Sequence, residues 1–242
     1  MDGGPGLRKI PADLGEAAAI QEAVARASEK VPPASLAGMR YIAGADASYS
    51  PDGRMVHAAV AVLDFPDLAV VDRCRVTGEV TFPYVPGFFA FREGPAILSA
   101  VGALARRPDL LLVDGHGRAH PRRAGIATHV GFILKIPTIG VAKRILTGEV
   151  REVGAARGSS SPILGNGEIL GMAVRTREGS RPVCISPGHA VDPETAVRVI
   201  LATTGSSRIP APLREAHRLS REVGRRSSAS PVTLTVRTMQ DG

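Results

Sequence analysis

Three acidic residues stand at positions where a carboxylate is either unfavourable to bury or open to a ligand. Asp46 interrupts the apolar stretch YIAGADASY, where a buried carboxylate is unfavourable unless it is paired or binds a metal. Glu93 stands at the start of a helical segment, and Asp114 follows the apolar run Leu110–Val113. Converging carboxylates repel one another, and Mg²⁺ relieves that repulsion while keeping positions for water and phosphate oxygens. Such ions can promote phosphodiester hydrolysis.

Each of these acids also has an ordinary structural interpretation. Asp46 could belong to a turn, Glu93 could be a helix-start charge stabilised by the helix dipole, and Asp114 could cap a strand end. Taken singly, these interpretations explain the residues as well as a metal does. Their placement around one strand–helix–strand unit favours the metal site.

The segment DGHGRAHPRRAG, residues 114–125, concentrates histidine, arginine and glycine in one loop. Asp114, His116 and His120 have the ligand types and the close spacing of a transition-metal site such as zinc. In a second interpretation the glycines allow close approach of a nucleotide, and His120, Arg122 and Arg123 face phosphate. In a third interpretation the segment is a solvated basic loop.

Two further side chains suit a nucleic-acid substrate. Lys143 follows the apolar run Thr138–Val141 and could place its charge beside a reacting phosphate, or it could be a helix-start lysine in water. Tyr84 stands between prolines in PYVP, residues 83–86. An aromatic ring on such a stiff loop can stack on a base or enter a duplex, unless it packs beneath its own loop.

The elements that position these residues begin with a helix over 14–30. Strands over Tyr41–Tyr49, Met55–Phe65 and Ala69–Val80 are separated by turn sequences, which predicts an antiparallel meander. A helix follows the PYVP loop, with Pro95 in its first turn, where a missing N–H is tolerated.

Strands and helices then alternate. We expect strands over 110–113 and 138–141, a helix near 126–135, a flexible connection over 155–168, a hairpin over 169–176 and 182–186, and helices at about 193–203 and 212–224. This order predicts a single α/β domain over 14–224, with a ribonuclease-H-like mixed sheet flanked by helices. A flexible arm over 1–13 and a disordered tail over 225–242 are expected around it.

The composition indicates a polyanionic partner. The 242 residues carry a formal net charge of +7, and the sequence pI is about 10.1. Basic side chains release counterions from nucleic-acid phosphates, although a solubilising surface has the same composition. No apolar run of about 18 residues and no signal-peptide pattern are present, so we expect a cytoplasmic protein without a membrane span, with Cys74 and Cys184 reduced.

Several motifs together resemble one family. From about Leu36 to about Arg221 the chain is similar to bacterial-type endonuclease V, the deoxyinosine 3′ endonuclease. The similarity lies in AGADASY, PYVPGFFAFREGPAIL, PDLLLVDGHGRAHPRRAGIATHVG and IPTIGVAKRIL, and more weakly in SPGHAVDPETA and PLREAH. The combination of PYVPG…FRE and DGHG-x-AHPR is highly specific.

The resemblance implies a ribonuclease-H-like fold, a Mg²⁺ or Mn²⁺ cofactor, and hydrolysis of the second phosphodiester 3′ to inosine. It implies metal binding by Asp46, Glu93 and Asp114, and catalytic roles for Lys143, His120 and His217. It also implies a wedge role for Tyr84, a substrate-binding role for the motif arginine Arg92, and a hypoxanthine pocket built largely from the main chain of Gly87, Phe89, Gly115 and Ile126.

The resemblance also implies the partner, DNA that contains deoxyinosine or other deaminated bases, bound by a monomer. Phe88-Phe89, Ala190 and Leu213 depart from the family pattern, which bears on pocket dimensions and some phosphate contacts. Alternatives are the same catalytic core acting on inosine in RNA or on mismatched or flap DNA. A relative that only binds nucleic acid is another alternative, which the three carboxylates and Lys143 argue against.

Overall fold

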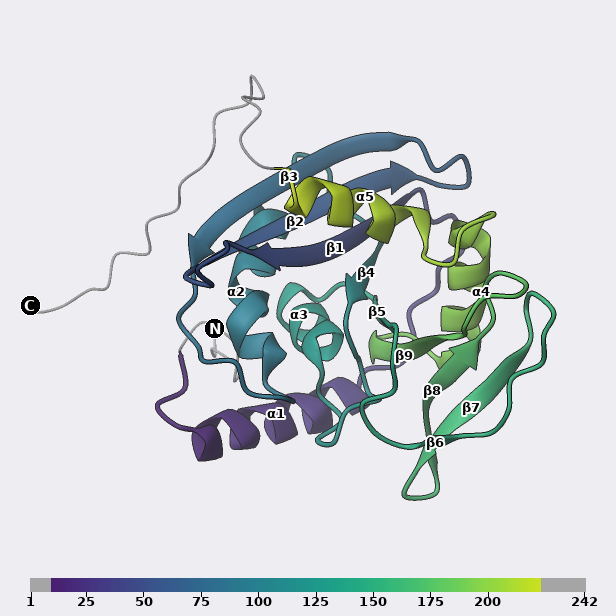
Figure 1. Cartoon of the computed structure of the whole chain (residues 1–242), viewed down its shortest axis with the longest axis horizontal. Coiled ribbons are helices and arrows are strands. Elements are labelled where there is room, and N and C mark those ends of the chain that lie inside the picture. Colours follow the sequence, from purple (N-terminus) through teal and green to yellow (C-terminus); the bar gives the residue numbers. More distant parts are fainter. Residues whose placement is uncertain (1–9, 223–242) are drawn as a thin grey trace, which may run out of the picture.

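A computed structural model describes residues 10–222, which form one nine-stranded mixed sheet with helices on both faces (Figure 1). The expected arm and tail fall mostly or wholly outside this range. The sheet order is β3-β2-β1-β4-β5-β9-β8-β7-β6. The strands are β1 (Tyr41–Tyr49), β2 (Met55–Asp64), β3 (Val70–Glu79), β4 (Leu110–Asp114), β5 (Thr138–Ala142), β6 (Glu149–Val150), β7 (Ser160–Gly165), β8 (Glu168–Val174) and β9 (Val183–His189). The helices are α1 (Leu14–Glu29), α2 (Phe89–Gly102), α3 (Ile126–Leu134), α4 (Pro193–Thr204) and α5 (Ala211–Ser220).

The strand pairing brings two of the predicted acids together on neighbouring central strands. The first three strands form the expected antiparallel meander, and β4 then pairs in parallel with β1. Ala45 lies opposite Val113 in this pairing. The next residues along the two strands, Asp46 inside β1 and Asp114 at the end of β4, therefore lie at adjacent positions where β4 ends, and open α/β sheets bind ligands at such carboxyl ends.

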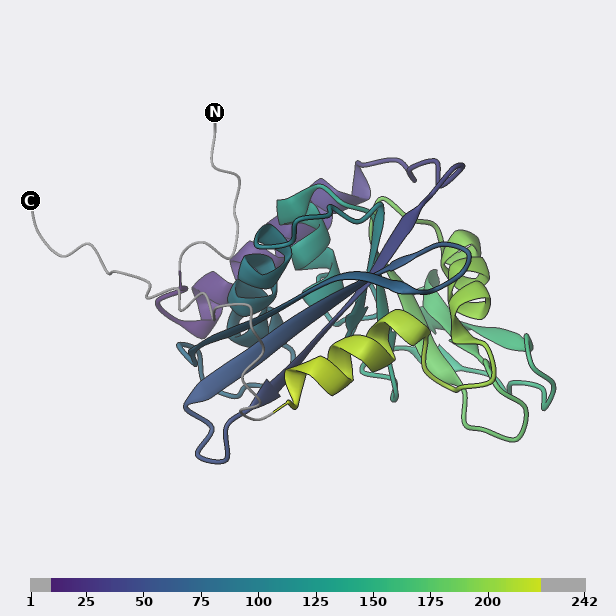
Figure 2. The ribbon, with the colours of Figure 1, turned by 90° about the horizontal axis from the view of Figure 1, so that it is seen from above.

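Alternation along the strands divides the core into two layers. Ala43, Ala45, Leu111 and Val113 pack in one apolar cluster with residues of α1, α2 and α3. Ile42, Leu110 and Leu112 pack in a second cluster with residues of α4 and α5. Figure 2 shows α5 on the opposite side of the sheet from α1 and α2. Because side chains alternate, Asp46 and Asp114 face the α5 layer.

The confirmed fold class, a mixed sheet flanked by helices, includes a hairpin that we did not predict. Part of the expected flexible connection is β7, which pairs with β8 so that Gly165 lies opposite Glu168. The two residues between them, Asn166 and Gly167, have φ values of +55° and +80°. An Asn-Gly pair that adopts positive φ is the preferred two-residue loop of a tight hairpin. The expectation of a flexible segment is therefore wrong.

Helix α2 begins earlier than expected. It starts at Phe89, so Glu93 lies in the second turn rather than at the start, and Pro95 lies inside the helix. The prediction that Pro95 occupies the first turn is wrong, and its missing N–H leaves the Phe91 carbonyl without its usual helical partner. The early start places Phe89 and Glu93 on one helix, one turn apart. Within residues 10–222, no helix is long and apolar enough to cross a membrane.

Candidate active site

The three predicted carboxylates line one pocket. Asp46 from β1, Glu93 from α2 and Asp114 from β4 share a cavity of about 460 Å³ with Lys143, which follows β5. We call this cavity the carboxylate pocket. Asp46 is buried, and Glu93 and Asp114 are partly buried. The pocket joins elements from both sheet faces, because Glu93 reaches it from α2 and the two aspartates reach it from β1 and β4.

Each carboxylate has a partner inside the chain. The Tyr49 hydroxyl donates to Glu93 Oε1 at 2.8 Å. His217 Nδ1 lies 2.7 Å from Asp46 Oδ2, and Lys143 Nζ lies 3.8 Å from Asp114 Oδ2. Lys143 thus lies beside the carboxylates, as expected. Tyr49 was not predicted, although it stands three residues after Asp46, where alternation turns its ring toward α2.

Burial and mutual repulsion disfavour the charged forms of these acids. Burial raises the pKa of Glu93 to about 7, and the negative charges of Asp46 and Asp114 add to that rise. Burial and the charge of Asp46 also raise the pKa of Asp114, while Lys143 and His217 oppose the change. A bound cation would favour the ionised form of all three.

These donors suit a hard cation better than zinc. Carboxylate oxygens alone are the donor set of Mg²⁺ or Mn²⁺. In the described range no three His, Cys, Asp or Glu side chains are arranged tightly enough to hold an ion as they stand. The zinc alternative lacks His120 as a ligand, because its Nε2 donates to the Gly87 carbonyl and its Nδ1 accepts from the Arg122 backbone N–H.

The residues expected to form a base pocket line the same cavity. They are Gly87, Phe89, Gly115 and Ile126. Gly115 has a φ of +146°, and a Cβ there would lie 2.5 Å from Cγ2 of Ile126. Only glycine fits this position, so a ligand would meet the backbone directly beside Asp114.

Tyr84 contacts a residue of the carboxylate pocket. Its side chain is 66% exposed, which excludes packing beneath its loop. The ring meets Phe89 edge-on, with centroids 5.4 Å apart, and Phe89 lines the pocket. Tyr84 therefore lies next to the carboxylate pocket without lining it.

Four basic side chains bind within the chain rather than facing the pocket as free cations. Arg92 donates to the Phe82 carbonyl at 2.7 Å and lies 4.7 Å above the Tyr49 ring. Arg122 and Arg123 donate to the carbonyls of Gly87 and Gly165, and His120 also binds Gly87. His120 nevertheless lines the carboxylate pocket, and contact of His120, Arg122 and Arg123 with phosphate stays a prediction.

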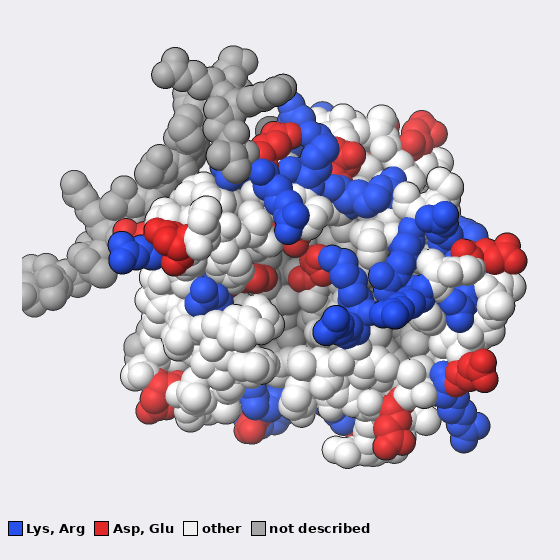
Figure 3. Space-filling view, viewed as in Figure 1, with Lys and Arg blue, Asp and Glu red and all other residues white. Residues whose placement is uncertain are grey.

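A basic pocket adjoins the carboxylates. Asp114 and Lys143 line both cavities, and the second one, of about 350 Å³, also has Arg208, Arg214 and His217 in its wall. In Figure 3 acidic side chains border a hollow near the centre of this face, and Lys and Arg side chains gather beside it. Such a surface suits a phosphate backbone entering next to the carboxylates.

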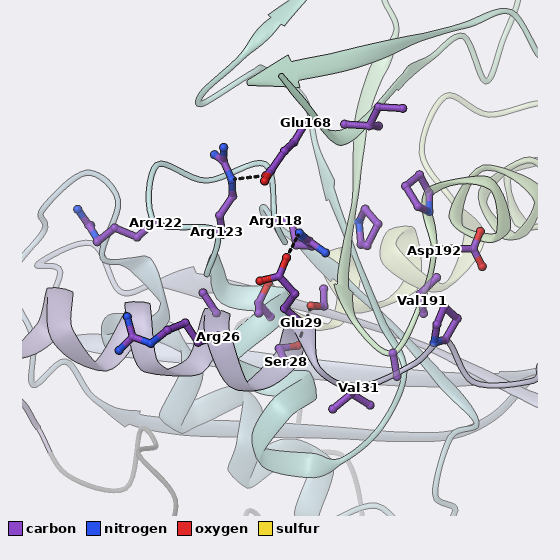
Figure 4. Close-up of a pocket in the computed structure, with 18 of the residues that line it drawn as sticks. Arg26, Ser28, Glu29, Val31, Arg118, Arg122, Arg123, Glu168, Val191 and Asp192 are labelled. Carbon is purple, nitrogen blue, oxygen red and sulfur yellow. Dashed lines mark hydrogen bonds and ion pairs between the residues drawn. The ribbon is translucent and has the colours of Figure 1, made fainter. Parts of the chain in front are cut away.

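A larger cavity, of about 600 Å³, lies at the carboxyl end of α1, and we call it the α1-end pocket. Figure 4 shows two of its arginines, Arg118 and Arg123, turned toward carboxylates. Arg118 pairs with Glu29 at 3.0 Å and Arg123 with Glu168 at 3.5 Å. Its charges are therefore largely balanced within the chain.

Comparison with known proteins places this geometry in one family. The family model for Endonuclease V matches residues 20–218. An endonuclease V of Gloeobacter violaceus is 47% identical over 200 residues, which cover 81% of this chain and 80% of that protein.

Solved structures agree with the sequence comparison. The crystal structure of endonuclease V from Streptomyces avermitilis superposes with a TM-score of 0.82 at 42% identity, covering 88% of this chain and 93% of that one. Ciona intestinalis endonuclease V, in complex with a 24mer DNA containing an inosine followed by a ribo-adenosine, gives a TM-score of 0.73 at 27% identity, covering 86% and 96%. The chain with three carboxylates around one pocket belongs to the endonuclease V family.

Proposed function

We propose that this protein is a Mg²⁺-dependent endodeoxyribonuclease that hydrolyses the second phosphodiester 3′ to deoxyinosine and leaves a 5′-phosphate. The observation that carries the proposal is one cavity lined both by three carboxylates and by the expected backbone base pocket. Family membership supports the class of enzyme, and the inosine-containing DNA bound to the Ciona relative supports the target.

Asp46, Glu93 and Asp114 would hold the metal, with Mn²⁺ as a substitute for Mg²⁺. The ion would supply charge neutralisation and an activated water. Lys143 has a half-exposed side chain beside Asp114, so its ammonium group is free to pair with a phosphate oxygen. His217 holds Asp46 through Nδ1 and lies in the wall of the basic pocket, where the cleaved strand would pass.

Recognition would depend on extrusion of the damaged base from the duplex. Flipping costs a few kcal/mol and is cheapest for a poorly paired base, which favours deoxyinosine over normal bases. The backbone around Gly87 and Gly115 would meet the flipped base, and Tyr84 would fill the gap in the stack. A tight backbone pocket would exclude the 2-amino group of guanine.

Inosine in RNA is the second candidate substrate. The Ciona complex contains a ribo-adenosine directly after the inosine, which favours tolerance of ribose at that position in the family. The 2′-hydroxyl is the group that distinguishes the two substrates.

The test is a nicking assay on an end-labelled duplex with a single deoxyinosine, in Mg²⁺ and in EDTA. We expect one Mg²⁺-dependent nick at the second phosphodiester 3′ to the lesion and none in a matched duplex with guanine. Measurement of cleavage of an RNA with the same sequence and a single inosine distinguishes the DNA substrate from the RNA substrate. Cleavage of the guanine duplex at an equal rate, or no nick in Mg²⁺, would overturn the proposal.

A further inference from the structure

The carbonyl oxygen of Gly87 accepts hydrogen bonds from three side chains. Gln21 Nε2 and His120 Nε2 each lie 2.9 Å from it, and Arg122 Nη2 lies at 3.1 Å. A carbonyl oxygen has two lone pairs, so three donors use its full capacity. Gly87 stands between Tyr84 and the start of α2, inside the segment 82–89 that we call the recognition loop.

Gln21 is the centre of this cluster. It is fully buried in α1, the helix whose amino end is capped by Asp13. Its Nε2 also donates to the Ala124 carbonyl at 3.2 Å, and its Oε1 accepts from Arg122 Nε at 2.5 Å. One amide therefore joins α1, the recognition loop and the segment before α3. A buried amide with its donors and acceptor in use fixes orientation more than it adds stability.

His120 has both ring nitrogens engaged in the same cluster. Nε2 carries the proton donated to Gly87, and Nδ1 accepts from the Arg122 backbone N–H at 3.2 Å. Burial lowers the pKa of His120 to about 4, which agrees with a neutral ring in this tautomer. No ring nitrogen remains for proton transfer to a substrate.

Arg122 also contacts the side chain that follows Gly87. The Arg122 guanidinium lies 4.2 Å above the ring of Phe88, the residue after Gly87. Gly87 has a φ of +81°, and a Cβ there would lie 3.3 Å from Arg122 Nη2 and 3.6 Å from His120 Nε2. The cluster therefore holds the peptide that leads from Tyr84 to Phe89.

We propose that Gln21, His120 and Arg122 are positioning residues that clamp Gly87 and so hold the recognition loop in the conformation that selects the damaged base. The inference rests on the proposed function and deepens it, because it assigns selectivity to a helix outside the catalytic motifs. Loss of the clamp should impair discrimination between deoxyinosine and guanine, and leave the carboxylates in place.

The test uses the full chain with Gln21→Met and Gln21→Glu. Both variants lose the hydrogen bonds that Gln21 Nε2 donates. Gln21→Glu keeps the side-chain volume and the contact with Arg122 Nε, so it replaces Gln21→Met as the test variant if Gln21→Met does not fold. Ser28→Ala is the matched control, because it removes another buried α1 contact, to His189, that lies away from Gly87. We measure kcat/KM for deoxyinosine and guanine duplexes, and hydrogen exchange of residues 82–89 by mass spectrometry.

For both Gln21 variants we expect the deoxyinosine-to-guanine ratio to fall roughly tenfold, the scale of one buried hydrogen bond, with faster exchange in the recognition loop. Ser28→Ala should change neither. Variants that melt earlier but keep wild-type selectivity and loop exchange would overturn the clamp. A wild-type protein that does not nick deoxyinosine would overturn the proposed function instead, and loop exchange would still report on the clamp.

Discussion

The carboxylate pocket and the α1-end pocket are both lined by charged side chains, and they differ in how those charges are compensated. In the α1-end pocket Arg26, Arg118 and Arg123 each lie within 4 Å of a glutamate oxygen. In the carboxylate pocket three acids face one another, and the cations in contact with them are Lys143 and, when protonated, His217.

The difference in charge compensation distinguishes the two pockets more than their volumes do. The α1-end pocket is the larger cavity, about 600 Å³ against 460 Å³, but its ion pairs are partly exposed and contribute little. The carboxylate pocket holds desolvated, repelling acids, an arrangement that costs stability unless a ligand compensates for it. We therefore expect substitutions in the carboxylate pocket to change activity and stability, and substitutions in the α1-end pocket to change neither.

The largest expected effect is the loss of a metal carboxylate. Asp46→Asn or Asp114→Asn should lower Mg²⁺-dependent nicking of a deoxyinosine duplex on the order of 10³-fold, because a transition-state charge loses its stabilising ion. Glu29→Gln in the α1-end pocket is the control and should nick like wild type. Near-wild-type cleavage by either asparagine variant would show that the carboxylate assignment is wrong.

Removal of the pocket's lysine should have the next largest effect. Lys143→Met should reduce kcat roughly 100-fold, the scale for loss of one group that stabilises developing charge. Arg118→Met removes a cation that is already paired with Glu29, and single-turnover rates should show no change for it. Equal effects of the two substitutions would contradict a special role for Lys143.

A smaller effect is expected for Tyr84, whose ring contacts Phe89 of the carboxylate pocket. Tyr84→Ala should reduce the preference for deoxyinosine duplex over undamaged duplex roughly ten- to hundredfold, the energy of one stacked base. Its melting temperature should stay close to wild type, because the side chain is mostly exposed. Ile169→Ala, an exposed apolar residue of the α1-end pocket, is the control for binding assays. An unchanged preference would leave Tyr84 without a recognition role.

The smallest expected effect is a gain in stability without metal. Glu93 has a folded pKa of about 7 against 4.5 in the unfolded chain, so between these values the folded state binds more protons and stability falls as pH rises. In EDTA, Glu93→Gln should raise unfolding free energy by on the order of 1–3 kcal/mol at pH 8 and by less at pH 5. Glu29→Gln should give no gain at either pH. A difference between Glu93→Gln and wild type that does not change with pH would contradict the raised pKa of Glu93.

Much of the arrangement could be predicted from local sequence. Asp46 inside an apolar strand and Asp114 after an apolar run predicted converging carboxylates, and the parallel pairing of β1 with β4 places the two residues at adjacent positions. The start of α3 at Ile126 also agrees with the pattern. These features depend on periodicity and turn residues, which are local.

Other features depend on contacts between residues that are distant in the sequence. Gln21 meets Gly87 across 66 residues of sequence, and nothing in the composition of α1 indicates that contact. His120 has the residue type of a catalytic group, and its engagement with Gly87 becomes visible only in three dimensions. The Asn166-Gly167 pair, by contrast, was a local hairpin signal within reach of sequence analysis.

The most direct test of the central claim is a crystal structure of the protein soaked in Mn²⁺, with anomalous diffraction used to locate the ion. The account predicts an anomalous peak in the carboxylate pocket, coordinated by Asp46, Glu93 and Asp114, with the Tyr49–Glu93 and His217–Asp46 hydrogen bonds rearranged to release the oxygens. A peak at His116 and His120, or a pocket without Mn²⁺ at saturating concentration, would contradict it.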